Sequence, residues 1–177
     1  MSNYKIKLSK IKAFAFDVDG VFTDGTVLAT DSGDLLRSHN VKDGYAVKMA
    51  IIQGFPVAII TGGASESILK RFEQIGLNKN EIYLKSLNKI TDFLDFCKRN
   101  NLKPEEVLFM GDDIPDIGIL KECGLATCPS DAVAEVKEVC EYISLYPGGR
   151  GCVREVIEQT LKIHNKWVAN SEAFSEE

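Results

Sequence analysis

The chain has 177 residues, of which 45% are hydrophobic and 27% are charged, and its formal net charge is -5. That length allows one domain with a substantial core, and we treat residues 1–177 as a single domain. The acidic balance and the absence of a dense Lys/Arg run exclude the basic stripe of a nucleic-acid-binding protein. No run approaches the roughly 18 apolar residues of a membrane span, and the first residues lack the apolar core of a signal peptide. The sequence therefore predicts a cytoplasmic protein with no nucleic-acid or membrane partner.

The five cysteines are odd in number and form no C-x-x-C pair. We interpret them as reduced thiols, which agrees with a cytoplasmic location. Because free cysteine packs as a small apolar residue, we expect the cysteines to be buried.

In the first half of the chain, short apolar runs alternate with stretches that have helical spacing. The patterns predict, in chain order, a strand over Ala13–Asp17, a hairpin of Thr26–Thr30 and Leu35–Asn40, a helix over Asp43–Gln53, a strand over Val57–Thr61, a helix over Ser65–Ile75, a strand over Ile82–Leu84 and a helix over Lys89–Arg99. The hairpin is indicated by the turn-forming residues from Asp31 to Asp34, which separate its two short runs.

The same alternation continues in the second half. It predicts a strand over Val107–Met110, a helix from Asp113 to about Cys123, a strand over Leu125–Cys128, a helix over Ala132–Val139, a strand over Tyr142–Ser144 and a helix over Cys152–Trp167. The polar tail after about residue 169 is expected to fray. Together the elements indicate an α/β fold: a three-layer, Rossmann-like parallel sheet with helices on both faces and a short β-hairpin insertion at about residues 26–40.

Polar side chains gather where the predicted strands end or the next helix opens. They are Asp17, Asp19, Thr61, Lys89, Asp112 and Asp113. In a parallel sheet of this kind, ligands bind outside the carboxyl ends of the strands, so these side chains form one candidate site.

These residue types suit phosphoryl transfer with a bound Mg²⁺. Carboxylates that meet at one point repel each other unless a cation joins them, and oxygen-only ligands favour Mg²⁺. A carboxylate oxygen can attack phosphorus to form an acyl phosphate, and an acid two residues further on can protonate the leaving alkoxide and then activate water. A lysine and a threonine can hold the oxygens of the transferring group.

At these positions the sequence resembles the haloacid dehalogenase superfamily. Asp17 to Gly20 reads DVDG and looks like its D-x-D-G motif, and Ile59 to Gly62 reads IITG and looks like its second motif. Lys89 stands where the lysine of the third motif would be, and GDD at residues 111–113, with Asp116, looks like its G-D-D-x-x-D motif. The resemblance covers about residues 11 to 165 and implies a magnesium-dependent phosphatase.

Longer stretches are similar to a capless branch of this superfamily. They read DVDGVFTDG from Asp17, NVKDG from Asn40 and GGRGCVRE from Gly148. Members of the branch hydrolyse the 8-phosphate of an eight-carbon keto-acid sugar in lipopolysaccharide precursor synthesis, and they are typically homotetramers. Only about 40 residues separate Asp19 from Thr61, and the hairpin and one helix fill them, which leaves no room for a cap domain.

The resemblance implies how the phosphoryl group is handled. Asp17 would be the nucleophile and a metal ligand, and Asp19 would be the acid/base and a ligand through its backbone carbonyl. Asp112 would be the third protein ligand of Mg²⁺. Thr61 and Lys89 would hold the phosphoryl oxygens during catalysis.

The resemblance also implies which residues surround the metal and the small-molecule substrate. Asp113 and Asp116 would support the metal ligands from behind. The residues that would contact the sugar-acid phosphate are Asn40, Val41, Lys42, Asp43, Gly44, Lys48, Gly62, Arg71 and Arg150.

The sequence departs from the branch at one position. An arginine often follows the Thr-Gly of the second motif there, whereas this chain has Gly63. Lys48, Arg71 and Arg150 are candidates to bind the substrate carboxylate instead, and we favour the two arginines because a guanidinium can hold a carboxylate with two hydrogen bonds.

Two other functions remain open. One is the same chemistry on a nine-carbon keto-acid sugar 9-phosphate. The other is a non-catalytic, oligomeric regulatory module with the same fold, although Asp17, Asp19 and Asp112 are all present. A phosphomutase would normally need a cap domain.

Overall fold

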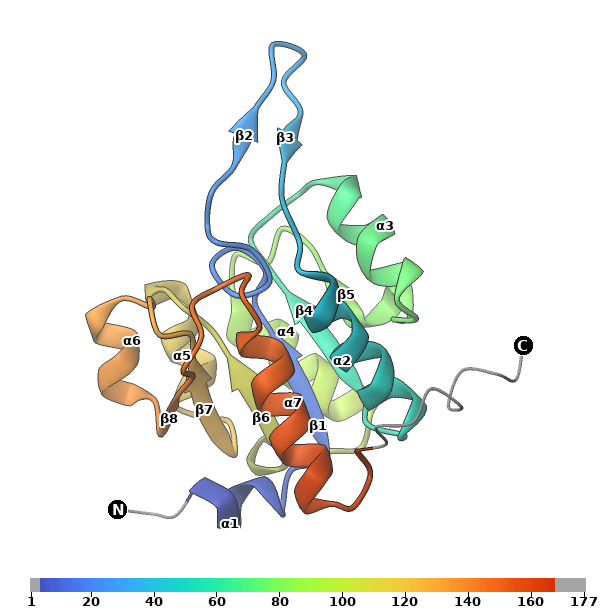
Figure 1. The fold of residues 1–177 in the computed structure, drawn as a ribbon, viewed down its shortest axis with the longest axis vertical. Coiled ribbons are helices and arrows are strands. Elements are labelled where there is room, and N and C mark those ends of the chain that lie inside the picture. Colours follow the sequence, from blue (N-terminus) through green and yellow to red (C-terminus); the bar gives the residue numbers. More distant parts are fainter. Residues whose placement is uncertain (1–3, 168–177) are drawn as a thin grey trace.

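A parallel sheet forms the centre of the computed structural model, which describes residues 4–167. Over these residues its six strands have the order β5-β4-β1-β6-β7-β8, and every pairing is parallel (Figure 1). The strands are β1 (Ala13–Phe16), β4 (Val57–Ile60), β5 (Ile82–Tyr83), β6 (Val107–Met110), β7 (Leu125–Cys128) and β8 (Tyr142–Ile143). The predicted three-layer α/β fold is confirmed.

Helices follow most of the strands. They are α1 (Tyr4–Leu8), α2 (Val41–Ile52), α3 (Glu66–Gln74), α4 (Lys89–Arg99), α5 (Ile117–Leu120), α6 (Ala134–Val139) and α7 (Cys152–Ile163), with short 3-10 turns η1 (Lys79–Glu81), η2 (Pro104–Glu106) and η3 (Ile114–Asp116). The sequence analysis did not predict α1.

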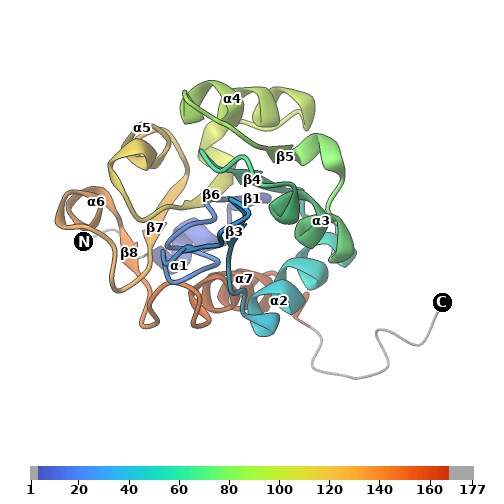
Figure 2. The ribbon, with the colours of Figure 1, turned by 90° about the horizontal axis from the view of Figure 1, so that it is seen from above.

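Each face of the sheet carries its own core because side chains alternate along a strand. In β1, Phe14 and Phe16 pack on the side of α2, α3 and α7, whereas Ala13 and Ala15 pack on the side of α4, α5 and α6. Figure 2 shows these helices as two layers with the sheet between them. All four residues are fully buried, which explains why this strand reads as an uninterrupted apolar run.

Several helix boundaries differ from the predictions, and two of the differences have clear local reasons. Helix α2 begins at Val41 rather than Asp43, because the side chain of Asn40 accepts a hydrogen bond from the Lys42 N–H (2.9 Å) and caps the helix. Helix α7 ends at Ile163 rather than Trp167, and Asn165 then takes a left-handed φ of 56°.

The predicted helix from Asp113 to about Cys123 is wrong in form. The segment is the 3-10 turn η3 followed by the four-residue helix α5. Pro115 lies in the first turn, where its missing N–H costs nothing. The side chain of Asp113 accepts from the Ile114 N–H at 2.7 Å and fixes the start of the turn.

The predicted hairpin is confirmed, although its paired part is shorter. Strands β2 (Leu28–Ala29) and β3 (Leu35–Leu36) are antiparallel, with Leu28 opposite Leu36. The hairpin projects beyond the sheet, above the end of β1 (Figure 1). Its leucines are exposed, Leu28 by 64% and Leu36 by 49%.

Strand β1 lies between β4 and β6, so the chain changes direction across the sheet at this point. The carboxyl ends of these strands are therefore where a ligand site is expected. Within residues 4–167 the structure has no helix long and apolar enough to cross a membrane. The polar tail after residue 169 lies outside the described residues.

Candidate active site

The carboxyl ends of β1, β4 and β6 open into a cleft of about 490 Å³. Asp17 directly follows β1, Thr61 follows β4, and Asp112 stands two residues beyond β6. The cleft is lined, among others, by Asp17, Asp19, Thr61, Gly63, Lys89 and Asp112. The structure thus brings the predicted catalytic and metal-binding residues together.

Lys89 joins two carboxylates at the floor of this cleft. Its Nζ lies 2.9 Å from Asp17 Oδ2 and 2.8 Å from Asp116 Oδ1. Burial would lower the pKa of Lys89, but the charges of Asp17 and Asp116 outweigh it and raise this pKa above the usual value. The side chain is therefore a buried ammonium, held in place from two sides.

Asp116 is fully buried and supports the neighbouring backbone. Its Oδ2 accepts hydrogen bonds from the N–H groups of Asp112 (3.0 Å) and Asp113 (3.3 Å), while its Oδ1 accepts from Lys89. Both oxygens are thus occupied by protein donors. Asp116 is placed to fix the loop that carries Asp112, whereas Asp113 caps η3 and lines the cleft.

Asp17 and Asp112 each carry a buried oxygen with no protein partner among the described residues. These atoms are Asp17 Oδ1 and Asp112 Oδ1. Ligand atoms of Asp17, Asp112 and Asp116 lie within 4.8 Å of one another. A buried carboxylate oxygen without a donor is costly, and an oxygen-only set favours a hard divalent cation. The residues present therefore fit a Mg²⁺ site, with Asp17 and Asp112 as ligands.

The pKa shifts of Asp17 and Asp112 also support a bound cation at this position. Burial raises the pKa of Asp17 to about 7, the charge of Asp116 adds to this effect, and Lys89 opposes it. Burial also raises the pKa of Asp112 to about 7, together with the charges of Asp17 and Asp116. Negative charge thus accumulates where water is excluded, and a bound cation would relieve the repulsion.

Two glycines of the motifs are needed because acidic side chains lie close to their Cα atoms. A Cβ on Gly20 would lie 1.9 Å from Asp112 Oδ2, and Gly20 also has a φ of +82°. A Cβ on Gly111 would lie 2.4 Å from Cγ of Asp116. Any side chain at either position would displace one of the acidic groups, so both glycines belong to the construction of the site.

The acid/base candidate Asp19 has a partner that the sequence analysis missed. Arg37, which follows β3, donates from Nε to Asp19 Oδ1 (2.7 Å) and from Nη2 to Asp19 Oδ2 (3.0 Å). The Arg37 side chain is only 6% exposed. Nothing in the local spacing signals this pair, because the hairpin brings together residues that stand 18 positions apart.

Thr61 is buried, with 1% exposure, and its hydroxyl oxygen accepts from the Gly63 N–H at 3.1 Å. Its own hydroxyl hydrogen remains for a ligand in the cleft. Gly62 also lines the cleft, beside Thr61. The geometry agrees with the phosphoryl-binding roles predicted for Thr61, Gly62 and Lys89.

The NVKDG segment is mainly structural, which differs from its predicted role. Asn40 caps α2 and donates to the Gly149 carbonyl (3.3 Å). Asp43 is fully buried and accepts from the N–H groups of Gly151 (3.2 Å) and Arg154 (2.7 Å) at the start of α7. Within one chain the Asp43 side chain thus faces the start of α7 and not the cleft, and its predicted contact with the substrate stays a prediction.

The remaining predicted contacts of this segment are also apart from the cleft. Val41 is 76% exposed on α2, and Lys48 is exposed on the same helix. Gly44 lies against Arg71, whose Nη2 would be 2.6 Å from a Cβ at that position. These residues do not line the main cleft of a single chain.

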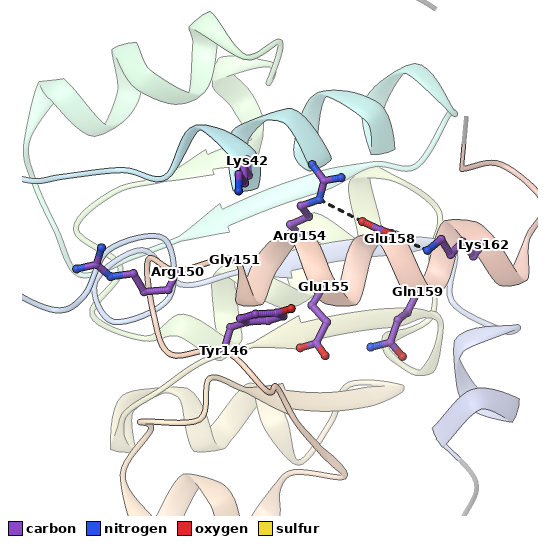
Figure 3. A pocket seen from close by; sticks show the side chains of 9 residues that line it. All are labelled: Lys42, Tyr146, Arg150, Gly151, Arg154, Glu155, Glu158, Gln159 and Lys162. Carbon is purple, nitrogen blue, oxygen red and sulfur yellow. Dashed lines mark hydrogen bonds and ion pairs between the residues drawn. The ribbon is translucent and has the colours of Figure 1, made fainter. Parts of the chain in front are cut away.

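Arg150 belongs to other hollows of the surface. One, of about 430 Å³, runs along α7, where Figure 3 shows Lys42 beside Arg154, while Arg150 lies on the far side of Gly151. The other, of about 200 Å³, lies between Arg150 and the base of the hairpin at His39. Arg150 is thus not brought to the main cleft within one chain.

Comparison with known proteins identifies the family. The profile of the haloacid dehalogenase-like hydrolases matches residues 65–151. The 3-deoxy-D-manno-octulosonate 8-phosphate phosphatase of Escherichia coli K12 is 32% identical over 160 residues, which are 90% of this chain and 84% of that protein. This chain belongs to the haloacid dehalogenase-like phosphatases. The phosphatase is accordingly a phosphoric monoester hydrolase, as the sequence analysis predicted.

Solved structures agree with this assignment. The phosphatase matches the Moraxella catarrhalis 3-deoxy-D-manno-octulosonate 8-phosphate phosphatase, solved with magnesium, phosphate and KDO, with a TM-score of 0.88 and 30% identity over 93% of this chain and 94% of that one. It matches the cobalt-bound Haemophilus influenzae deoxy-D-mannose-octulosonate 8-phosphate phosphatase with a TM-score of 0.88 and 29% identity over 94% of each chain. The capless fold is thus confirmed, and the divalent metals of these relatives agree with the acidic cluster found here.

Proposed function

We propose that this phosphatase uses Mg²⁺ to hydrolyse 3-deoxy-D-manno-octulosonate 8-phosphate to the free sugar acid and phosphate, in lipopolysaccharide precursor synthesis. The observation that carries the metal-dependent chemistry is the pair of buried, unpartnered oxygens on Asp17 and Asp112 beside Lys89. The substrate is suggested by relatives that carry this activity in their names.

The residues of the chain supply the steps of the reaction. An Asp17 oxygen forms a bond to phosphorus while the bond from phosphorus to the sugar oxygen breaks, and Asp19 gives that oxygen a proton. Asp19 then takes a proton from water, which attacks the aspartyl-phosphate and releases phosphate as the bond to Asp17 breaks. Thr61 and Lys89 hold the phosphoryl oxygens. Mg²⁺, held by Asp17, Asp112 and the Asp19 carbonyl, would neutralise charge on the phosphate.

We further propose a homotetramer built on the hairpin. Leu28, Leu35 and Leu36 are 64%, 46% and 49% exposed, and a lone two-stranded ribbon cannot cover them. A cluster of exposed leucines above an open cleft fits burial against other subunits, which would also help to close the site. The five cysteines are free thiols, which agrees with a cytoplasmic location.

The activity is tested by phosphate release from a panel of sugar phosphates with and without Mg²⁺. The panel includes the eight-carbon substrate, the nine-carbon keto-acid 9-phosphate and neutral hexose phosphates. We expect the highest kcat/KM on the eight-carbon substrate, no turnover after exhaustive chelation, and none in Asp17→Asn. Preference for the nine-carbon ester would replace the proposed substrate, and no turnover of any ester would favour the regulatory module instead.

A further inference from the structure

Arg37 lies directly behind two residues that line the cleft, Asp19 and Gly63, and part of its hydrogen-bonding capacity is unused. Among the described residues it donates three hydrogen bonds, two to the Asp19 carboxylate and one from Nη1 to the Leu35 carbonyl (3.2 Å). A guanidinium has five N–H donors, so two remain for another acceptor. Such a fixed, almost fully buried cation has already lost most of its side-chain freedom and would bind an anion at little further entropic cost.

Gly63 lies next to this guanidinium, and the absence of its side chain leaves the space between them open. A Cβ at Gly63 would lie 3.7 Å from Arg37 Nη2, 3.3 Å from Thr61 Oγ1 and 2.9 Å from the Ile68 Cδ1. Because Gly63 lines the cleft, its missing side chain leaves Arg37 next to the cleft wall, near the phosphoryl-binding Thr61. The hairpin thus places a cation beside position 63, where the chain itself has none.

Two guanidiniums and one carboxylate act on His39, two residues after Arg37. Arg71 lies against Gly44 in the first turn of α2. Burial lowers the pKa of His39, and the positive charges of Arg71 and Arg37 add to this effect, whereas Asp19 opposes it. Arg71 thus adds a second positive charge on the side of the cleft where Arg37 lies, while Asp19 opposes both.

We propose that Arg37 is a specificity-determining residue that binds the carboxylate of the substrate while the phosphate lies over Asp17. The inference rests on the proposed phosphatase reaction for the second anion. It replaces Arg150, which lies on other hollows, and it leaves Arg71 as an outer source of positive charge. Nε and Nη2 of Arg37 each donate one hydrogen bond to Asp19, and the two N–H donors that remain unused bind the substrate carboxylate.

The test compares esters that differ in the carboxylate. The kcat/KM of wild type, Arg37→Ala and Arg37→Lys is measured on 3-deoxy-D-manno-octulosonate 8-phosphate against para-nitrophenyl phosphate, and on 6-phosphogluconate against glucose 6-phosphate. Loss of Arg37 also frees Asp19, so all four rates can fall. The diagnostic quantity is therefore the kcat/KM for the ester with a carboxylate divided by that for its partner without one. We expect this ratio to fall at least about tenfold in Arg37→Ala, and less in Arg37→Lys because the charge is kept.

Arg99→Ala is the matched control, because Arg99 forms ion pairs with Glu81 and Asp95 away from the cleft. Its ratios should equal those of wild type. Ratios within about twofold of wild type in both Arg37 variants would overturn the proposal, since Arg37 would then only position Asp19 or the hairpin. If Arg37→Ala is inactive, Arg37→Gln takes its place, because it removes the charge but keeps most of the side chain. Wild type that ignores the eight-carbon ester but prefers 6-phosphogluconate through Arg37 would refute the proposed substrate and uphold this inference.

Discussion

Asp116 gives the sharpest test of how the metal site is built. In Asp116→Ala, Lys89 loses one of its two carboxylates, and the N–H groups of Asp112 and Asp113 lose their acceptor at a fully buried position. Lys89 keeps Asp17 as its second partner, but the weakened buried ion pair and the two N–H groups without an acceptor together cost about 3–5 kcal/mol of unfolding free energy. Loosening the loop that carries Asp112 should also weaken Mg²⁺ binding by about 10–100-fold.

The conservative variant Asp116→Asn separates geometry from charge. Its amide oxygen can still accept from the two backbone N–H groups, but its amide nitrogen would face the Lys89 ammonium. We expect a smaller loss of stability than in Asp116→Ala, about 1–3 kcal/mol, and still a clear loss of Mg²⁺ affinity because one negative charge is missing.

Unfolding in urea measures the stability, and Mg²⁺ titration by calorimetry without substrate measures the affinity. Asp95→Ala is the control, because Asp95 is exposed and accepts from the Tyr83 hydroxyl, outside the cleft. Folded Asp116 variants with wild-type Mg²⁺ affinity would refute the reasoning, since the support of Asp112 would then play no part in holding the ion.

Three further predictions concern other parts of the molecule. Asp19→Asn should keep Mg²⁺ binding by calorimetry but lower kcat about 10²–10⁴-fold, because an amide cannot act as the acid/base; unchanged kcat would contradict this. Leu35→Asp should reduce the particle mass in light scattering and lower activity in parallel, whereas a wild-type mass would argue against the hairpin interface. Burial raises the pKa of Asp43 above its ordinary 3.8, so its contribution to stability is complete below that value and lost as pH rises through the raised pKa. Asp43→Asn should flatten this dependence in urea unfolding between pH 4 and 8, and an unaltered slope would refute it.

Much of the fold could be predicted because local pattern and tertiary environment agree. Strands β6 and β7 and helix α4 have the predicted bounds. Central strands are apolar on both faces, so they stand out as continuous runs between polar ends. The acidic residues of the candidate site were equally visible, since a parallel sheet brings its strand ends to one edge whatever the details of packing.

The features that the sequence did not reveal share a different cause. Asp43 reads as a polar residue in a motif, but its direction depends on how α2 packs against the start of α7. Arg37 reads as an ordinary charge on a hairpin, and its pairing with Asp19 depends on the path of the ribbon back toward the sheet. Spacing in the sequence carries neither fact, because both depend on contacts between distant segments.

The unpartnered oxygens of Asp17 and Asp112 would also make the stability of the fold depend on a bound cation. The two residues follow β1 and β6, adjacent strands from opposite halves of the chain, and their repulsion works against closing the sheet at its centre. A cation bound between them acts as a removable cross-link, and its contribution grows with the free ion concentration. Magnesium starvation would then lower the stability of the phosphatase as well as its activity. Without the cation, the sheet would separate more often between β1 and β6, which would expose the chain to unfolding and degradation.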